Sequence, residues 1–111
     1  MIKMLIGFRR RQGMSMQEFK DYRRDIHAPL LFNLPEADKI RRFVVSYPVA
    51  APGWPEPTFD AVVEAWFDSL DDLNALYTCE AFQEVVDPDH ANFIDLASVS
   101  RIVSEEIVVV G

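Results

Sequence analysis

The order of strand-like and helix-like segments constrains this fold more than any other feature of the chain. Four segments are rich in β-branched and other apolar residues and are predicted to be strands, at residues 2–9, 40–49, 60–67 and 98–109. Two segments with helical spacing of apolar residues lie after the first and third strands. This βαββαβ order is the ferredoxin-like arrangement. We therefore predict an α+β fold with one antiparallel four-stranded sheet and both helices on one face.

The helices have clear sequence signals at their boundaries. The stretch Ser15-Met16-Gln17-Glu18 forms a capping box, and Ser69 precedes the second helix. Pro29 lies inside the first helical pattern and is predicted to loosen the helix near residues 25–26, because its ring displaces the carbonyl four residues back. Residues 87–89 (DPD) are predicted to break the second helix, with a further helical turn over residues 91–95.

The composition fits a single domain spanning residues 1–111, of which 50% are hydrophobic. The net charge of -7 argues against nucleic acid and against an anionic membrane surface, because both would repel the chain. No apolar stretch approaches the roughly 20 residues needed to cross a bilayer. The single cysteine, Cys79, cannot form an internal disulfide. We expect a cytoplasmic protein.

The sheet is predicted to need a cover on both faces. In the strand at residues 60–67, neither alternating set of side chains is polar throughout. Two helices cover only one face, and a second copy of the chain is the simplest cover for the other. We therefore expect a homodimer. Residues 48–57 hold four of the seven prolines and are predicted to form an irregular loop near a pocket mouth or across the dimer, with Trp54 partly exposed.

Three stretches of the chain resemble motifs of the EthD family, and the resemblance extends from residue 1 to about residue 109. They are residues 19–30 (FKDYRRDIHAPL), 64–73 (EAWFDSLDDL) and 89–95 (DHANFID). Arg23 stands where the family has tryptophan, and His90 replaces an acidic residue. The resemblance implies a ferredoxin-like protomer of the dimeric α/β barrel superfamily, with a pocket between sheet and helices. It does not choose among the chemistries of that superfamily.

His27 is the main catalytic candidate, because an imidazole at the edge of an apolar helix face can move protons near neutral pH. Asp95 is the second catalytic candidate, and either Asp95 or Glu64 is expected to bond to His27 in an apolar pocket. Asp89, beside Pro88, is interpreted as a turn residue. The candidate ligand-binding residues are Tyr22, Glu64, Trp66 and His90. With only two histidines and four glycines, neither a metal site nor a phosphate-binding loop is predicted, and no cofactor is expected.

Three functions remain open from the sequence. The first is a cofactor-independent acid–base enzyme, of the dehydratase, isomerase or cyclase type, acting on a small apolar aromatic or cyclic compound. The second is a cofactor-free monooxygenase, in which the substrate itself activates oxygen. The third is a non-catalytic accessory protein that binds a small hydrophobic molecule.

Overall fold

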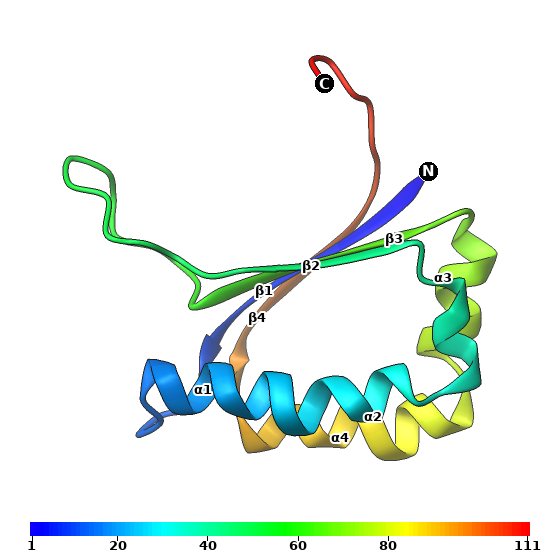
Figure 1. Cartoon of the computed structure of the whole chain (residues 1–111), viewed down its shortest axis with the longest axis horizontal. Helices are drawn as coiled ribbons and strands as arrows, with labels where there is room; N and C mark the ends of the chain where they lie inside the picture. Colours follow the sequence, from blue (N-terminus) through cyan, green and yellow to red (C-terminus); the bar gives the residue numbers. More distant parts are fainter.

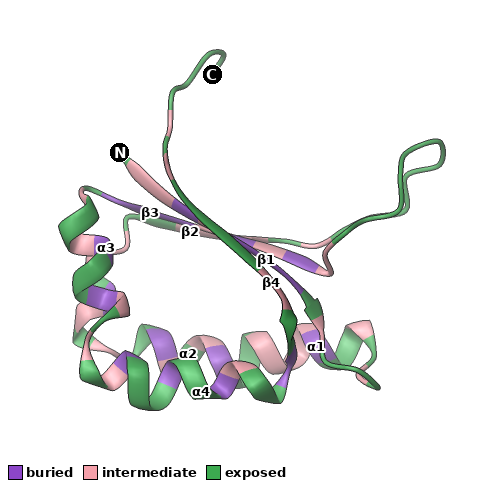
Figure 2. Cartoon of the chain, turned by 180° about the vertical axis from the view of Figure 1, so that it is seen from behind, coloured by how far each residue is buried: buried purple, intermediate pink, exposed green.

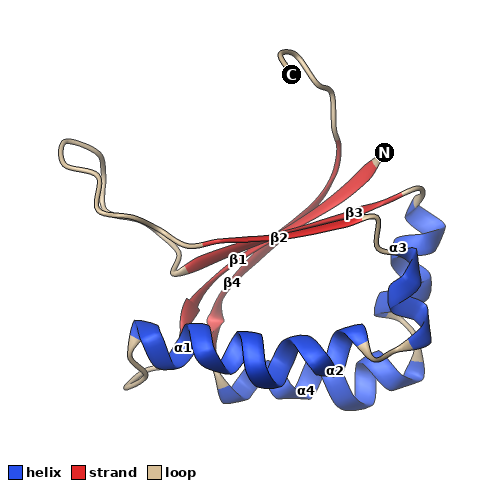
Figure 3. Ribbon diagram, in the orientation of Figure 1, coloured by secondary structure: helices blue, strands red, loops and turns tan.

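A single antiparallel sheet organises the computed structural model, which describes all of residues 1–111. Its strands lie in the order β2-β3-β1-β4. Helices cover one face of this sheet and leave the other face open (Figures 1 and 3). The predicted α+β, ferredoxin-like fold is therefore confirmed. The strands are β1 (Ile2–Arg10), β2 (Arg42–Ser46), β3 (Ala61–Phe67) and β4 (Ile94–Glu105).

The helical layer consists of two broken helices. The first is a run of α1 (Met16–Tyr22), the π-helical turn η1 (Arg23–His27) and α2 (Ala28–Phe32), and the 3-10 turn η2 (Pro35–Lys39) follows it. The second contains α3 (Leu70–Tyr77), the π-helical turn η3 (Phe82–Val86), α4 (Asp87–Asp89) and the 3-10 turn η4 (His90–Asn92). The predicted capping box is present: Ser15 Oγ accepts from the Glu18 N–H, and the Glu18 carboxylate accepts from the Ser15 N–H.

Each π turn lies just before a proline. The Ala28 N–H donates to Arg23 O, and the Asp87 N–H donates to Phe82 O, so both bonds reach back five residues. The turn η1 confirms that Pro29 loosens the first helix. The predicted break at residues 87–89 is wrong, because the helix passes through this stretch. Pro88 is the second residue after η3, as Pro29 is the second residue after η1.

The last strand also differs from its prediction. β4 begins at Ile94, earlier than expected, so the helical turn predicted for residues 91–95 is confined to η4. It ends at Glu105, and residues 107–111 leave the sheet as an exposed tail. The loop between β2 and β3 is irregular as predicted, and Trp54 is 78% exposed. Both segments extend away from the side on which the helices lie (Figure 1). None of the helices has both the length and the apolar character of a membrane span.

The core fills the space between the sheet and the helices. Alternation along each strand sends one set of side chains toward the helices, including Met4, Ile6 and Phe8 of β1, all of which are buried. Phe19 of α1 and Phe93, just before β4, both pack edge-to-face with Phe8 and in tilted geometry with each other. Figure 2 shows buried residues on the facing sides of the sheet and helices.

Candidate functional site

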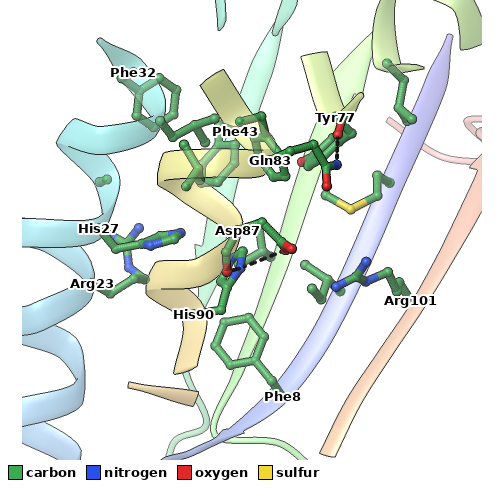
Figure 4. A pocket seen from close by; sticks show the side chains of 18 of the residues that line it. Phe8, Arg23, His27, Phe32, Phe43, Tyr77, Gln83, Asp87, His90 and Arg101 are labelled. Atoms are coloured by element: carbon green, nitrogen blue, oxygen red, sulfur yellow. Dashed lines mark hydrogen bonds and ion pairs between the residues drawn. The ribbon is translucent and has the colours of Figure 1, made fainter. Parts of the chain in front are cut away.

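A cavity of about 430 Å³ lies between the sheet and the helical layer. Fourteen of its twenty lining residues are hydrophobic, a composition typical of sites for small apolar ligands. All four strands and both broken helices contribute side chains to it. The polar side chains that line it are Arg23, His27, Gln83, Asp87, His90 and Arg101 (Figure 4). The pocket predicted between sheet and helices is therefore present.

His27 forms a buried pair with Asp89 at the wall of this cavity. Nδ1 of His27, the last residue of η1, lies 2.9 Å from Oδ2 of Asp89, the last residue of α4. The other carboxylate oxygen, Oδ1, accepts from the Tyr22 hydroxyl at 2.6 Å and from Asn92 Nδ2 at 3.0 Å. Burial alone would raise the pKa of Asp89, but these hydrogen bonds outweigh it and hold the pKa below its usual value. Asp89 is therefore an ionised acceptor.

The ionised carboxylate fixes the protonation of the imidazole. Because Asp89 can only accept, the proton of neutral His27 sits on Nδ1 and the lone pair on Nε2. Burial lowers the pKa of His27 despite the opposing effect of Asp89, so the imidazole is neutral at pH 7. Nε2 makes no hydrogen bond within the chain, yet it is not among the fully buried unpaired atoms. A basic nitrogen therefore remains accessible in an apolar cavity.

His90 places a second imidazole beside the first. The ring centroids of His27 and His90 are 4.5 Å apart. Nδ1 of His90 donates to the carbonyl oxygen of Asp87 at 3.0 Å, which leaves Nε2 as the acceptor. Burial lowers the pKa of His90 as well. No group of three or more His, Cys, Asp or Glu side chains is arranged to hold a metal ion.

The predicted pairing of His27 with Asp95 or Glu64 is wrong. Asp95 is exposed, and its carboxylate accepts from the N–H of Ala97 two residues on. Glu64 bonds to Lys3 Nζ at 2.9 Å on the opposite face of the sheet, because strand alternation turns it away from its helix-facing neighbours Val63 and Ala65.

The other candidate residues occupy three different places. His90 lines the cavity, as expected of a ligand-binding residue. Tyr22 does not line it and acts on the site through its hydrogen bond to Asp89. Trp66 lies on the open face of the sheet with Glu64, and its Nε1 donates to Glu106 at 3.0 Å.

Three site residues were not predicted from the sequence in these roles: Asp89 as the partner of His27, Asn92 as a donor to Asp89, and Arg101 as a charged residue of the cavity wall. Asp89 and Asn92 are three positions apart, a spacing that places both on one side of a helical turn. That spacing is a sequence signal that could have identified Asp89 as the carboxylate of the site. Arg101 shares a strand face with Val99 and Val103, and a lone charge among alternating apolar residues is also a signal.

Comparisons with known proteins agree with this fold. The EthD domain family model matches residues 11–97. An ethyl tert-butyl ether d (EthD) family protein from Bacillus halodurans C-125 has a TM-score of 0.75 and 20% identity, over 96% of this chain and 99% of that one. An EthD-like protein from Ralstonia eutropha JMP134 gives 0.66 and 22%, over 98% and 92%.

A third solved structure shares the fold. A dimeric protein of unknown function and ferredoxin-like fold from Bacteroides fragilis NCTC 9343 has a TM-score of 0.64 and 19% identity, over 95% of each chain. No curated protein matches the chain. Because the family model spans well over half of the sequence, the chain belongs to the EthD family.

Proposed function

We propose that the chain is a cofactor-independent acid–base enzyme that acts on a small, apolar aromatic or cyclic compound. One observation carries this proposal: the neutral imidazole of His27 presents Nε2 to an apolar cavity while Asp89 holds Nδ1 at 2.9 Å. A base held in one tautomer by a buried carboxylate is the arrangement used in acid–base dyads. The apolar lining favours an aromatic or cyclic compound.

Proton transfer from carbon is the reaction that this arrangement supports best. His27 Nε2 takes a proton from a carbon next to a carbonyl group, and the electron pair of the broken C–H bond remains on the substrate as an enolate. Asp89 stabilises the imidazolium that forms. If the proton then goes to a hydroxyl group on the next carbon, water leaves and a double bond forms. If it goes to another carbon, the product is an isomer.

The proposal includes a homodimer, because the open face of the sheet is partly apolar. On this face the apolar residues Leu5, Val62 and Ile102 surround Lys3 and Glu64, which form an ion pair. The relative from Bacteroides fragilis is described as dimeric. A two-fold pair of sheets would cover this face in each protomer.

Hydrogen–deuterium exchange in D₂O tests the acid–base step directly. The protein is mixed with 1-tetralone, a bicyclic ketone, and loss of the proton signal next to the carbonyl is followed by NMR. We expect exchange faster than the buffer rate for the wild type and close to the buffer rate for His27→Ala. Binding of 1-tetralone without faster exchange would favour the non-catalytic alternative. Consumption of oxygen during turnover of an aromatic substrate would favour the monooxygenase.

A further inference from the structure

The cavity contains two cations that have no anionic partner. Arg23 and Arg101 both line it, and neither has a carboxylate oxygen within 4.0 Å. The chain has 18 acidic side chains against 11 Lys and Arg. Because carboxylates are in excess, an arginine that faces the cavity and has no carboxylate partner is notable. Arg23 is engaged, since its Nε donates to the Tyr47 hydroxyl at 2.8 Å. The Arg101 guanidinium makes no hydrogen bond to any group of the chain.

Arg101 is also placed where a ligand can reach it. It lies on β4, one of the two edge strands of the sheet, with its side chain on the helix-facing side next to Val103. Figure 4 shows it pointing across the cavity toward Asp87 and His90. A smaller adjoining cavity of about 190 Å³ is lined by the same Arg101 and His90. Arg101 therefore stands at the exposed end of the site, and its guanidinium is not withdrawn into the protein.

We infer that Arg101 binds a carboxylate on the ligand, so the substrate class of this site is a small aromatic or cyclic acid. The guanidinium offers two parallel N–H donors that match a carboxylate, and such charge-assisted pairs are stronger than neutral hydrogen bonds. The ring system of the ligand would then lie against the apolar wall formed by Phe43, Leu73 and Phe82. In this position the body of the ligand passes His27 and His90. The inference rests on the function proposed above and specifies its substrate.

Asp87 is the acidic residue that lines the cavity, and it does not neutralise Arg101. Its carboxylate faces the His90 imidazole, with Oδ1 3.4 Å from Nδ1, and it forms no ion pair with Arg101. Arg101 also lowers the pKa of His90 through its positive charge, although burial is the larger cause. A carboxylate bound to Arg101 would offset that charge. Binding should therefore raise the pKa of His90, which a purely structural arginine would not do.

Pairs of probe molecules that share a ring system and differ in charge test the inference. Benzoate, 2-naphthoate and anthracene-2-carboxylate are each compared with the matching primary carboxamide by titration calorimetry on the full chain. We expect at least one carboxylate to bind about 10- to 100-fold more tightly than its amide. Arg101→Gln should abolish this preference, and Arg101→Lys should retain part of it. Arg11→Gln is the matched control, because Arg11 is exposed and lies outside the cavity.

The outcomes separate this inference from the proposed function. If no carboxylate in the series binds more tightly than its amide, or if Arg101→Gln leaves the preference intact, the inference is overturned. NMR titration of the His90 ring provides the second readout, and its pKa should rise in the 2-naphthoate complex of the wild type but not in Arg101→Gln. A retained charge preference without deuterium exchange on 1-tetralone-6-carboxylate, a ketone that also carries the carboxylate, would refute the acid–base enzyme and leave Arg101 as the anion-binding residue.

Discussion

At the scale of single residues, substitutions in the pair formed by His27 and Asp89 test its role in acid–base catalysis. Replacing His27 with alanine removes the base, and we expect the rate on a substrate to fall about 10²- to 10⁴-fold, the usual contribution of a positioned acid–base group. Asp89→Asn should also lower the rate, because an amide no longer stabilises the imidazolium. Asp95→Asn is the matched control, since its carboxylate is exposed and contacts only the local backbone. Equal losses in the two asparagine variants would contradict the role of Asp89.

The pH dependence of the reaction follows from the direction of the His27 pKa shift. Burial lowers this pKa below 6.5 even though the hydrogen bond to Asp89 raises it. The active form is the neutral imidazole, so kcat/KM should fall as the pH drops and His27 takes up a proton, with the midpoint of this acid limb below pH 6.5. In Asp89→Asn the raising contribution is lost, so the acid limb should move to still lower pH. Steady-state rates between pH 4.5 and 8 would measure the acid limb of the wild type and that of Asp89→Asn. A wild-type limb centred above pH 6.5 would contradict this assignment.

The choice between Asp89 and Asp95 shows what a sequence can and cannot say about a site. The sequence predicted His27 correctly as a cavity residue, because it lies at the edge of an apolar helix face. Its partner was not predictable in the same way. Asp89 and Asp95 are only six residues apart, and which of them faces the first helix depends on where the second helix ends. The sequence suggested a break at residues 87–89, but the helix continues and carries Asp89 into the core.

At the scale of elements, the two π turns explain why the helices were harder to predict than the strands. Strand positions follow from alternation, and the ladder fixes their register. A π turn adds one residue to a helical turn, and the only sequence signal for it here is the proline that follows. Pro29 gave that signal for η1, because a long helical pattern surrounds it. Pro88 stands between two aspartates, a sequence that is also typical of a turn, so the π form of η3 and the continuation of the helix into α4 were not predicted.

The contact between β1 and the loop before β3 gives a stability prediction. A methyl group added at Gly7 would lie 2.7 Å from the ring of Phe59, which is too close for an unshifted ring. Gly7→Ala should therefore lower the free energy of unfolding by about 1–3 kcal/mol, the usual cost of overpacking. In the double variant with Phe59→Ala this penalty should shrink, because the obstacle is gone. Urea unfolding of the two single variants and the double variant measures the coupling.

Gly13→Ala is the matched control for this coupling. Gly13 has a φ of +85° and no atom within 4 Å of an added Cβ. Alanine there is strained by the backbone alone, so its penalty should be the same with and without Phe59. If the penalties of Gly7→Ala and Phe59→Ala simply add, Phe59 does not pack on the sheet at Gly7.

At the scale of the whole molecule, the two faces of the sheet carry different features. The helix-facing side holds the core, the cavity and the histidines. The open side carries an ion-pair cluster, in which Lys3 Nζ lies 2.9 Å from Glu64 and 3.1 Å from Glu106, beside exposed apolar residues. The loop at residues 47–60 and the apolar tail at residues 107–110 also extend away from the helices (Figure 1). These features give the open side the properties of an interface.

A charge placed on the open face tests the proposed homodimer. Wild-type protein should have twice the chain mass of 12.7 kDa in light scattering at micromolar concentration. Ile102 is 58% exposed in the protomer and pairs with Leu5 at the centre of the β1–β4 ladder. Ile102→Glu should leave the protomer folded but weaken the dimer by about 100-fold or more, because two-fold symmetry would bury two unpaired carboxylates, each costing several kcal/mol.

Val85→Glu is the control, since Val85 is 46% exposed on η3, in the helical layer. If both variants dimerise as tightly as wild type, the interface lies elsewhere, and a folded wild-type monomer would refute the homodimer.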